Sequence, residues 1–359
     1  MGLTDEQYGA LKVLKDRIQS GELVSILQGP AGSGKSFTLK CLLEELGYAE
    51  DEAYFTAFTG NAAKLLMDNG LNASTIHKLI YKPIVSHGRI IGFAKKPERE
   101  LRGLKLIIVD EFSMVSEELM KDLLSYKIPL LLVGDHYQLP PIGKPNEFTN
   151  QCHARLETVM RQALESSVLW AATRIRKGEI VKEGIHGEGN NALFVGRKHQ
   201  LDENWLRKDV QFLVGLNQTR VKLNNQISGS ALPQVGDKII FLKNDWESFI
   251  VNGSITTLEN FTENWRNKYH IAFHYDGMDY ERYFAYYQEE PKNHRRTKRD
   301  PRNVFDKAFA ITTHKAQGST INAPMCIVDE SGVFRQYAKN WQYTALTRST
   351  GNYPVAFLR

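Results

Sequence analysis

The residues from Gly29 to Ser36 have the types and the spacing that bind phosphate. They match the pattern G-x-x-x-x-G-K-[ST] and lie between an expected strand and an expected helix. Glycines let backbone N–H groups close around phosphate oxygens, and the N-terminus of a helix adds a favourable dipole. Lys35 is expected to contact the β- and γ-phosphates of a nucleotide, and the Ser36 hydroxyl to bind Mg²⁺. The expected phosphate-binding residues are Gly29, Gly32, Ser33, Gly34, Lys35 and Ser36.

Two acidic residues follow a second apolar run further along the chain. Asp110 and Glu111 come directly after the run Leu106–Val109. A carboxylate at the carboxyl end of a buried strand suits Mg²⁺ binding, so Asp110 is the expected metal ligand beside Ser36. Glu111 is placed to polarise an attacking water, which favours hydrolysis over transfer to an acceptor. The two motifs together predict a nucleotide hydrolase.

Four short apolar runs in the first 150 residues are the strands expected to position these motifs. Near-continuous apolar strands that alternate with helical patterns indicate a buried parallel sheet in an α/β fold. The helix after the first run has leucines at i, i+3, i+4 and i+7 and should end at Gly47. Residues 81–94 interrupt the pattern and predict a β-hairpin that turns at 86–88. The expected strands are Leu23–Gln28, Ala53–Phe58, Leu104–Val109 and Pro129–Val133.

The second half of the chain changes character along its length. Residues 153–183 look helical, and the glycine-rich residues 184–196 look like a connector. From about 234 to 290, short alternating runs with Asn-Gly and Asp-Gly turns predict a small β-barrel module. The basic residues at 292–302 fit a solvated loop, and the last part of the chain returns to the α/β pattern. The aromatic residues of the module expected mostly in its core are Trp246, Phe249, Tyr283, Tyr286 and Tyr287.

Composition excludes several classes of protein. The 359 residues leave room for two to three domains, and 42% hydrophobic with 24% charged residues is an ordinary globular balance. No apolar run approaches the ~20 residues that span a bilayer, and the polar N-terminus does not suit a signal peptide. Three scattered cysteines exclude a disulfide framework and fit a reducing cytoplasm. The net charge of +5 permits a polyanionic partner.

Four segments of the chain resemble the signature motifs of superfamily 1 helicases. The segment 133–141, Val-Gly-Asp-His-Tyr-Gln-Leu-Pro-Pro, resembles the third motif, and 110–114 resembles the second. The segment 312–320 resembles the fifth motif, and 343–349 resembles the sixth. Their order, spacing and compactness are similar to those of the RecD/Dda group of superfamily 1B DNA helicases, and most of all to its small phage members. The resemblance covers nearly the whole chain.

The resemblance implies two RecA-like P-loop domains in tandem, which bind ATP and Mg²⁺ in the cleft between them. It also implies a β-hairpin insertion, called a pin, in the first domain and an SH3-like β-barrel insertion in the second. The expected bounds are 1–80 and 104–152 for the first RecA-like domain, 81–103 for the pin, 153–230 and 303–359 for the second RecA-like domain, and 231–302 for the SH3-like insertion.

The resemblance assigns further residues to the nucleotide site. Arg161 matches the arginine of the fourth motif and Arg348 that of the sixth, and either would stabilise the γ-phosphate as an arginine finger. The alternative for each is an ordinary surface salt bridge. Gln138 would sense the γ-phosphate, and Gly318 would contact the nucleotide. Gln7 resembles an adenine-reading glutamine, although it also completes a helix capping box with the threonine three residues before it, and both interpretations can hold.

A second set of residues resembles the family's contacts with DNA. Single-stranded DNA needs positive charge and hydrogen-bond donors for its backbone and flat side chains for its bases. Phe93 in the hairpin is the expected wedge at the fork, with His87 as the second candidate; the alternative is Phe93 packed under a structural hairpin. His77 is equally well explained as a buried histidine at a helix start. The expected contacts with single-stranded DNA are Thr59, Asn61 and His77 from the first domain and Thr313 and His314 from the second.

By resemblance, the sequence predicts an ATP-dependent DNA helicase that moves 5′ to 3′ on single-stranded DNA and unwinds duplex. The first alternative is a single-strand-dependent ATPase translocase that mainly displaces bound proteins. A P-loop nucleotide kinase or switch protein fits less well because such proteins lack a second RecA-like domain and the motifs of Gln317-Gly318 and Arg348. A non-catalytic DNA-binding subunit fits less well because Lys35, Asp110, Glu111 and Arg348 are all present. The expected partners are single-stranded and forked DNA and a single-strand-binding or replication protein. We expect a monomer without a membrane partner, in the cytoplasm, or in the host cytoplasm for a phage protein.

Overall fold

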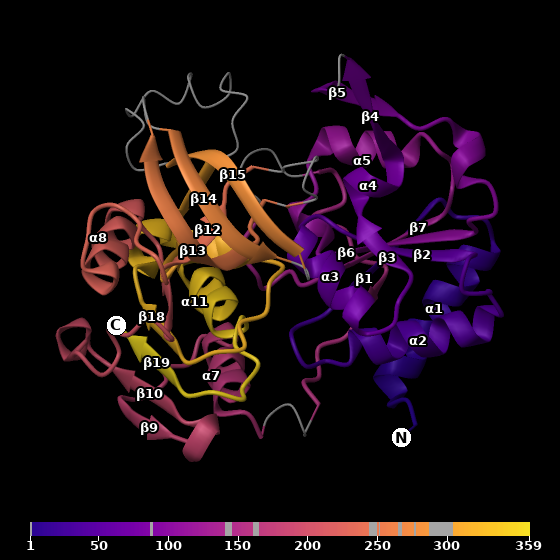
Figure 1. The fold of residues 1–359 in the computed structure, drawn as a ribbon. Coiled ribbons are helices and arrows are strands. Elements are labelled where there is room, and N and C mark those ends of the chain that lie inside the picture. The colour runs from indigo at the N-terminus through magenta and orange to yellow at the C-terminus, as the bar shows by residue number, and fades with distance from the viewer. Residues whose placement is uncertain are drawn as a thin grey trace. The chain divides into compact units, whose positions relative to one another are not determined.

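The chain folds into two compact units, Met1–Thr173 and Arg174–Arg359. The structure is a computed structural model, and Figure 1 draws it as a ribbon. The residues that it describes are 2–86, 89–140, 146–160, 165–243, 250, 252–264, 268–275, 278–286 and 304–359.

A six-stranded parallel sheet is the frame of the first unit. Its strands lie in the order β3-β2-β6-β7-β1-β8. The four strands expected from sequence are confirmed as β1, β2, β6 and β7. Because neighbouring strands are parallel, their carboxyl ends meet at one edge of the sheet, where a ligand site is usual. The strands are β1 (Val24–Gln28), β2 (Ala53–Ala57), β3 (Ala73–Thr75), β6 (Leu106–Asp110), β7 (Leu130–Gly134) and β8 (Ala154–Arg155).

Helices cover both faces of this sheet (Figure 1). In β1 the neighbouring residues Ile26 and Leu27 point into two different hydrophobic cores, as alternation in a strand requires. Leu27 packs with α1 and α2, whereas Ile26 packs with α4 and α5. Gly47 ends α2 in a left-handed conformation with φ 65°, as predicted. The helices are α1 (Asp5–Gln19), α2 (Lys35–Leu46), α3 (Gly60–Asp68), α4 (Ile76–Ile80), η1 (Glu98–Leu101), η2 (Phe112–Met114) and α5 (Glu117–Leu124).

The expected β-hairpin is present between α4 and η1. Strand β4 (Tyr81–Ser86) pairs antiparallel with β5 (Arg89–Lys95), with a register shift between Ile84 and Val85. Figure 1 shows the hairpin extending beyond α4 and α5 at one end of the unit. His87, the second candidate for the wedge, lies outside the described residues.

The segment that follows the first sheet differs from the prediction. Residues 153–183 were expected to be helical, but Ala154 and Arg155 form β8, which pairs with Leu27 and Gln28 of β1. The described helix in this region is α7 (Ser167–Arg176). The pairing with β1 places Ala154 and Arg155 in the sheet of the first unit. The chain divides into its two compact units at Thr173/Arg174, whereas the boundary expected from sequence is 152/153.

A second six-stranded sheet is the frame of the second unit, in the order β17-β11-β18-β19-β10-β9. Strand β9 pairs antiparallel with its neighbour, and the other pairs are parallel. The connector expected at 184–196 is wrong, because β10 pairs with β19 and buries Leu193 and Val195. The elements are β9 (Gly184–His186), η3 (Gly189–Asn191), β10 (Leu193–Gly196), η4 (Lys198–Gln200), β11 (Gln211–Val214), α8 (Asn217–Ser228), β17 (Ala310–Thr312), α10 (Thr313–Ala316), β18 (Met325–Val328), η6 (Ser331–Tyr337), α11 (Ala338–Leu346) and β19 (Val355–Leu358).

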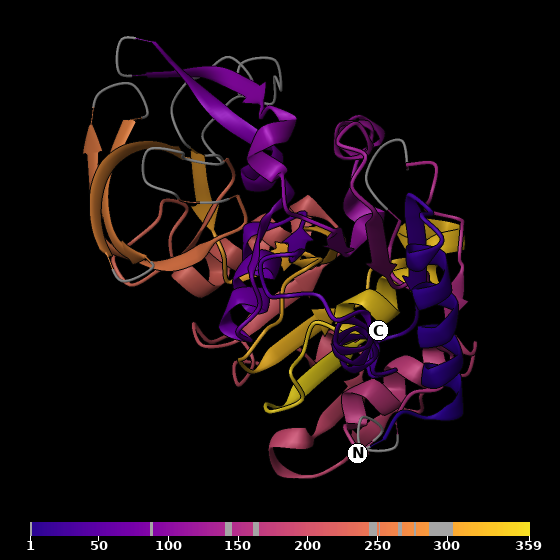
Figure 2. The same cartoon turned by 90° about the vertical axis from the view of Figure 1, so that its right-hand side faces the viewer.

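The β-module is confirmed as a closed five-stranded barrel in the second unit with its own hydrophobic core, and Figure 2 shows its strands curving into a ring. Tyr286 is buried in that core as expected, whereas Tyr283 is 54% exposed on the outside. The barrel also continues to Lys307, past the expected end at 302, because β16 closes it against β12. The other aromatic candidates Trp246, Phe249 and Tyr287 and the basic run 292–302 lie outside the described residues. The strands are β12 (Lys238–Phe241), β13 (Ile255–Asn264), β14 (Lys268–Tyr275), β15 (Met278–Tyr286) and β16 (Val304–Lys307).

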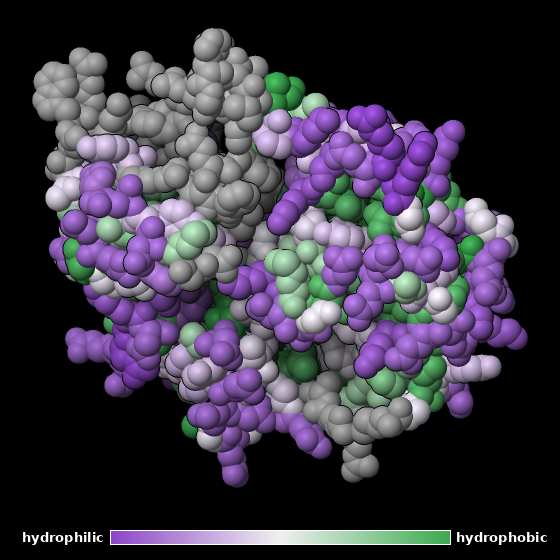
Figure 3. All heavy atoms as spheres, turned by 45° about the vertical axis from the view of Figure 1, so that its right-hand side comes forward, coloured by the Kyte–Doolittle hydropathy of each residue, from purple (hydrophilic) through white to green (hydrophobic). Residues whose placement is uncertain are grey.

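Polar side chains make up most of the described surface that Figure 3 shows, with apolar side chains scattered among them. Among the described helices, we find none with the length and apolar character needed to cross a membrane. The three cysteines Cys41, Cys152 and Cys326 are free thiols, as expected.

Candidate nucleotide and nucleic-acid sites

The glycine-rich loop has the strand–loop–helix context that its sequence predicted. It connects β1 to α2, with Gly32 at φ 77° and Gly34 at φ 83°, values that side-chain-bearing residues rarely adopt. A Cβ atom on Gly34 would lie 2.3 Å from Nε2 of Gln7, so only glycine fits here. The Gly29 N–H donates to the Gly134 carbonyl at 3.1 Å, which ties the loop to the end of β7. The backbone of the loop therefore has the tight, N–H-rich form that surrounds phosphate groups.

Lys35 and Ser36 lie in the first turn of α2. The Lys35 ammonium donates to the carbonyls of Gly29 at 2.7 Å and Pro30 at 3.0 Å, inside the loop. Ser36 is exposed next to it. A flexible cation held by neutral carbonyls of the loop can exchange these partners for phosphate oxygens, which bind it more strongly.

The two predicted acids meet the predicted sensor glutamine at the carboxyl edge of the sheet. The Glu111 N–H donates to Asp110 Oδ1 at 3.0 Å, and Glu111 Oε1 accepts from Gln138 Nε2 at 3.1 Å. Gln138 is only 7% exposed, so its amide has little freedom to leave the glutamate. Glu111 has φ 50°, a left-handed conformation that is strained for a non-glycine residue and is typical of functional positions. The structure brings together three residues that the sequence assigned to one site.

Phe112 and Asn146 support this acid pair, and sequence motifs alone did not identify the role of either. A Cβ atom on Gly134 would lie 2.8 Å from the Phe112 ring, so the ring packs directly on the backbone of β7. Asn146 is 3% exposed, and its amide donates to the carbonyls of Phe112 at 3.1 Å and Val115 at 2.8 Å. No local pattern marks Asn146, because its partners lie about thirty residues earlier in the chain.

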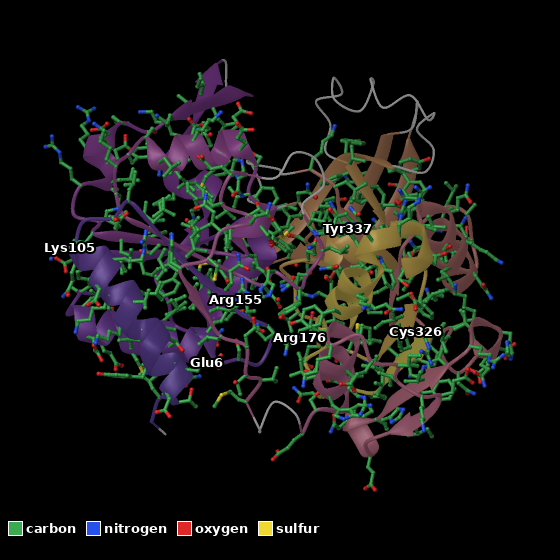
Figure 4. All side chains as sticks on the ribbon, turned by 180° about the vertical axis from the view of Figure 1, so that it is seen from behind. Glu6, Lys105, Arg155, Arg176, Cys326 and Tyr337 are labelled. Atoms are coloured by element: carbon green, nitrogen blue, oxygen red, sulfur yellow. The ribbon has the colours of Figure 1, made fainter. Side chains whose placement is uncertain are left out.

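The segment 153–160 runs along β1 and the phosphate loop. The N–H groups of His153, Leu156 and Met160 donate in turn to the carbonyls of Ile26, Gln28 and Gly32. The Glu6 carboxylate, at the start of α1, accepts from the N–H groups of Glu157 at 2.6 Å and Thr158 at 3.2 Å. Figure 4 labels Glu6 on α1 and Arg155 on the neighbouring strand β8. Arg161, the fourth-motif candidate, follows this segment and lies outside the described residues.

Gln7 links the start of α1 to the phosphate loop. Its backbone N–H donates to Thr4 Oγ1 and its Oε1 accepts from the Thr4 N–H, so the capping box is confirmed. Its Nε2 donates to the Ser33 carbonyl at 3.2 Å, and the residue is 2% exposed. Nε2 also lies 3.7 Å from Met160 Sδ, a weak acceptor, so an adenine would have to replace this contact. Adenine recognition by Gln7 stays a prediction.

Arg348 lies in the second unit, buried and without an acidic partner among the residues described. It is 6% exposed, and its guanidinium donates to the carbonyls of Thr344 and Ser319 and to the Thr347 hydroxyl. A buried guanidinium held by these neutral groups does not fit the alternative of a surface salt bridge. Burying a charge without a counter-ion is costly, which is typical of a cation kept for a ligand. Gly318, with φ 71°, precedes the Ser319 carbonyl in the turn after α10.

The DNA-contact candidates of the first unit differ in exposure. Thr59 caps α3, where its hydroxyl accepts from the Ala62 N–H at 3.2 Å; the Asn61 side chain lies outside the described residues. His77 is half-buried beside the rings of Phe58 and Tyr81, and burial lowers its pKa, so the imidazole is neutral at pH 7.

Phe93 in the hairpin strand β5 is 43% exposed. The alternative of a phenylalanine packed underneath the hairpin does not describe this structure.

The two candidates of the second unit lie in and beside the turn that begins α10. Thr313 is fully buried, and its hydroxyl donates to the Val214 carbonyl. Its side chain therefore supports the turn, and a contact of Thr313 with DNA stays a prediction. The His314 ring lies tilted beside Phe334, with 5.3 Å between the ring centroids, and burial lowers the pKa of His314. Phe334, which no motif singled out, in turn stacks on Trp341.

Comparisons with known proteins agree with this geometry. Residues 2–202 match the model of a family described as AAA domain. The ATP-dependent RecD2 DNA helicase of Deinococcus radiodurans is 30% identical over 387 residues, which covers 97% of this chain and 48% of that protein. The ATP-dependent DNA helicase Dda of Enterobacteria phage T4 is 27% identical over 190 residues, which covers 49% of this chain and 43% of that protein. The chain thus spans about half the length of these relatives.

The fold is also found in a solved structure of helicases. That structure, from work on DNA unwinding at forked double-stranded DNA by two coordinating Pif1 helicases, aligns with a TM-score of 0.62 and 20% identity. The alignment covers 99% of this chain and 92% of the other. At this identity the likeness establishes the shared fold.

Proposed function

Since the chain belongs to the AAA-domain family and is a RecD/Dda/Pif1-like relative within superfamily 1B, we propose that it is an ATP-dependent DNA helicase. It moves 5′ to 3′ along single-stranded DNA and separates the duplex ahead of it. The observation that carries the proposal is the meeting of the phosphate loop, the acid pair and Gln138 at one edge of the first sheet. The names of the relatives, which are ATP-dependent DNA helicases, support the choice of reaction.

The donor set of the first unit fits a magnesium-bound nucleotide. The loop around Gly34 has no room for a side chain, and Ser36 and Asp110 offer the hard oxygen ligands that Mg²⁺ prefers. ATP supplies the phosphoanhydride bond that is broken, and Mg²⁺ neutralises charge on its phosphates. Lys35 exchanges its loop carbonyls for phosphate oxygens. Glu111, which Gln138 holds by its carboxylate, orients the attacking water and accepts its proton.

Arg348 supplies the positive charge that phosphoryl transfer needs in its transition state. Its guanidinium is buried but held by neutral groups, so its charge is not already neutralised by a carboxylate of the described residues. An arginine finger accelerates related reactions by ~10³–10⁵. We assign this role to Arg348. Arg161 stays a second proposed finger, and Gly318 a proposed contact with the nucleotide.

The hairpin and the barrel are the proposed DNA-handling insertions. The hairpin β4–β5 acts as the pin, and the exposed Phe93 ring meets the base pair at the fork. The barrel acts as the SH3-like module that keeps the translocating strand in place. Separating one base-pair step costs about 1.4 kcal/mol on average, which a single ATP can supply. Single-stranded and forked DNA are the proposed partners; the Pif1 structure above comes from work on unwinding of forked double-stranded DNA.

The proposal is tested first by replacing the loop lysine. Lys35→Ala should reduce ATP hydrolysis stimulated by single-stranded DNA to background, because the phosphates lose their cation. Lys40→Ala on the exposed side of the same helix is the matched control and should behave as wild type. ATPase activity that survives in Lys35→Ala would refute the assignment of the site.

The polarity is tested with duplexes that carry a single-stranded tail on one end. A 5′-tailed duplex should be unwound in an ATP-dependent way, and a 3′-tailed duplex should not. Unwinding of only the 3′-tailed duplex would reverse the proposed direction. Displacement of streptavidin from tailed oligonucleotides without any unwinding would replace the helicase by the protein-displacing translocase.

A further inference from the structure

The hairpin β4–β5 needs support from the rest of the first unit. A two-stranded hairpin is at best marginally stable in water by itself. In the described part of this hairpin, Ile84 and Phe93 are each 43% exposed, so these two side chains are only partly packed. Contacts at the base of the hairpin therefore contribute to fixing its direction.

Tyr126 lies at this base and contacts the chain on both sides of the hairpin. Its hydroxyl is 3.1 Å from the Ile80 carbonyl, just before β4, and 2.7 Å from the Lys96 carbonyl, just after β5. The Lys96 N–H donates to the same Ile80 carbonyl at 2.8 Å and closes the base. Tyr126 is 6% exposed, so water does not compete for these bonds. The hydroxyl has one proton, which the two carbonyls share with Lys96 as the nearer acceptor, so it links both chain segments where they enter and leave the hairpin.

Three neighbours of Tyr126 strengthen the contact. The Tyr81 hydroxyl, in the first residue of β4, donates to the Asp122 carboxylate of α5. The ammonium of Lys95, in the last residue of β5, donates to Ser125 Oγ at 2.6 Å and lies 5.3 Å from the centre of the Tyr126 ring. Both strands are thus tied at their ends to the last turn of α5. Burial, together with Asp122, raises the pKa of the Tyr81 and Tyr126 hydroxyls, which keeps both protonated as donors.

Helix α5 is itself held at its start, close to the acid pair. It begins at Glu117, directly after η2, and Ser116 caps it by accepting from the Leu119 N–H at 3.3 Å. The Asn146 amide fixes the carbonyls of Phe112 and Val115 in the turn between Glu111 and α5. A single short helix therefore connects the hydrolytic edge of the sheet with the base of the hairpin.

We propose that Tyr126 is the positioning residue that mounts the hairpin rigidly on α5. The inference rests on the proposed function, in which the hairpin separates the strands. A hairpin that separates DNA strands must keep its position under load, so a rigid base is needed for DNA unwinding but not for ATP hydrolysis. Tyr126 touches neither nucleotide nor DNA in this scheme and acts through the hairpin.

The test compares Tyr126→Phe with Tyr48→Phe. Tyr48 is a partly buried tyrosine of the same unit with a lysine ammonium 5.5 Å from its ring centre, but its hydroxyl makes no hydrogen bond among the described residues. Hydrogen exchange of the backbone at 81–86 and 89–96 should be about fivefold faster in Tyr126→Phe, the effect of one lost hydrogen bond, and unchanged in Tyr48→Phe. The rate of fork unwinding should fall about fivefold in Tyr126→Phe. The kcat and KM for ATP hydrolysis with single-stranded DNA should stay at wild-type values.

The results distinguish a role of Tyr126 in holding the hairpin from general damage to the fold. Exchange and unwinding that match the Tyr48→Phe control would overturn the proposal, and so would a parallel loss of ATPase and unwinding, which indicates general damage. Where Tyr126→Phe does not fold, Tyr81→Phe removes the bond to Asp122 on one strand and should show the same split. Where the wild type hydrolyses ATP but never unwinds forks, the proposed helicase function fails, and the exchange measurement alone decides whether Tyr126 mounts the hairpin.

Discussion

Lys307 is a buried lysine of the second unit, in strand β16 of the barrel and beside the end of helix α8. The residue is fully buried in β16, and its ammonium donates to Asn225 Oδ1 at 2.7 Å and to the carbonyls of Ser230 and Ala231. The structure records no ion pair for it in the parts of the chain that are described. Burial lowers the pKa of Lys307 to about 8, although Asp237 and Asp306 nearby favour the charged form.

This pKa predicts a pH dependence of stability with a definite sign. The unfolded lysine has a pKa of about 10.4, so between pH 8 and 10 the unfolded state binds more protons than the native state. Stability should therefore rise with pH in this window, by about 1 kcal/mol from pH 7 to pH 9. Lys307→Met should lose this contribution, because a methionine does not titrate. Denaturant unfolding of both proteins at the two pH values measures the difference, and parallel curves would contradict the prediction.

Individual site residues could be predicted from sequence where a local pattern defines them. Lys35, Asp110 and Glu111 belong to short motifs whose chemistry does not depend on distant contacts, and they lie at the start of α2 and the end of β6, where their motifs predict them. Asn146 and Tyr126 could not be found in this way, because their partners lie thirty or more residues away in the chain. The burial of Thr313 could not be predicted for the same reason: its motif is local, but its hydroxyl partner lies on β11.

At the scale of elements, the end of β7 packs closely against the turn after β6. Gly134 ends β7 beneath the Phe112 ring, and Phe112 directly follows the hydrolytic Glu111. Phe112 is 1% exposed and cannot move aside easily. The fit between these two elements is therefore expected to control both stability and the position of the glutamate.

Gly134→Ala tests this fit. A Cβ atom would come 2.8 Å from the ring, and overpacking of this kind costs about 1–3 kcal/mol of stability. ATPase activity should fall as well, because the displaced ring moves Glu111. The matched control is Gly9→Ala in α1, where a Cβ atom meets nothing within 4 Å and should stabilise the helix by about 0.5–1 kcal/mol. Thermal unfolding of both variants measures the difference in stability. A Gly134→Ala protein with wild-type stability and ATPase activity would show that the Phe112 ring moves aside without cost.

A strand or helix could be predicted from sequence where its own residues form a clear apolar pattern. The four central strands of the first sheet are continuous apolar runs, and each is found near its expected bounds. Strand β8 has two residues and exists only because β1 leaves an edge beside Ala154 and Arg155. Strands β9 and β10 lie among glycines that resemble a connector, and pairing with β19 makes them strands. Tertiary pairing, which no local pattern contains, decided these three strands.

At the scale of the whole molecule, the two units each hold part of the proposed machinery. The first unit holds the phosphate loop, the acid pair and the hairpin, and the second holds Arg348 and the barrel. The net charge of the chain, 46 basic against 41 acidic residues, is too small to hold DNA by a general field. Binding must then depend on specific residues that contact the phosphate backbone, such as those after β2 in the first unit.

We therefore predict that the affinity for single-stranded DNA falls steeply with salt, with a slope set by the number of phosphates contacted. For single strands the logarithm of the affinity falls with slope about −0.7 per phosphate contacted, so three contacts already cost about twentyfold between 50 and 200 mM salt. Fluorescence anisotropy with a labelled oligonucleotide over this range gives the slope. Lys64→Ala on the exposed side of α3, after Thr59, should reduce the slope by about 0.7. Lys12→Ala, on an exposed position of α1, should leave it unchanged. A slope near zero in the wild type would mean that base stacking and not backbone contact holds the strand, because stacking releases no counter-ions.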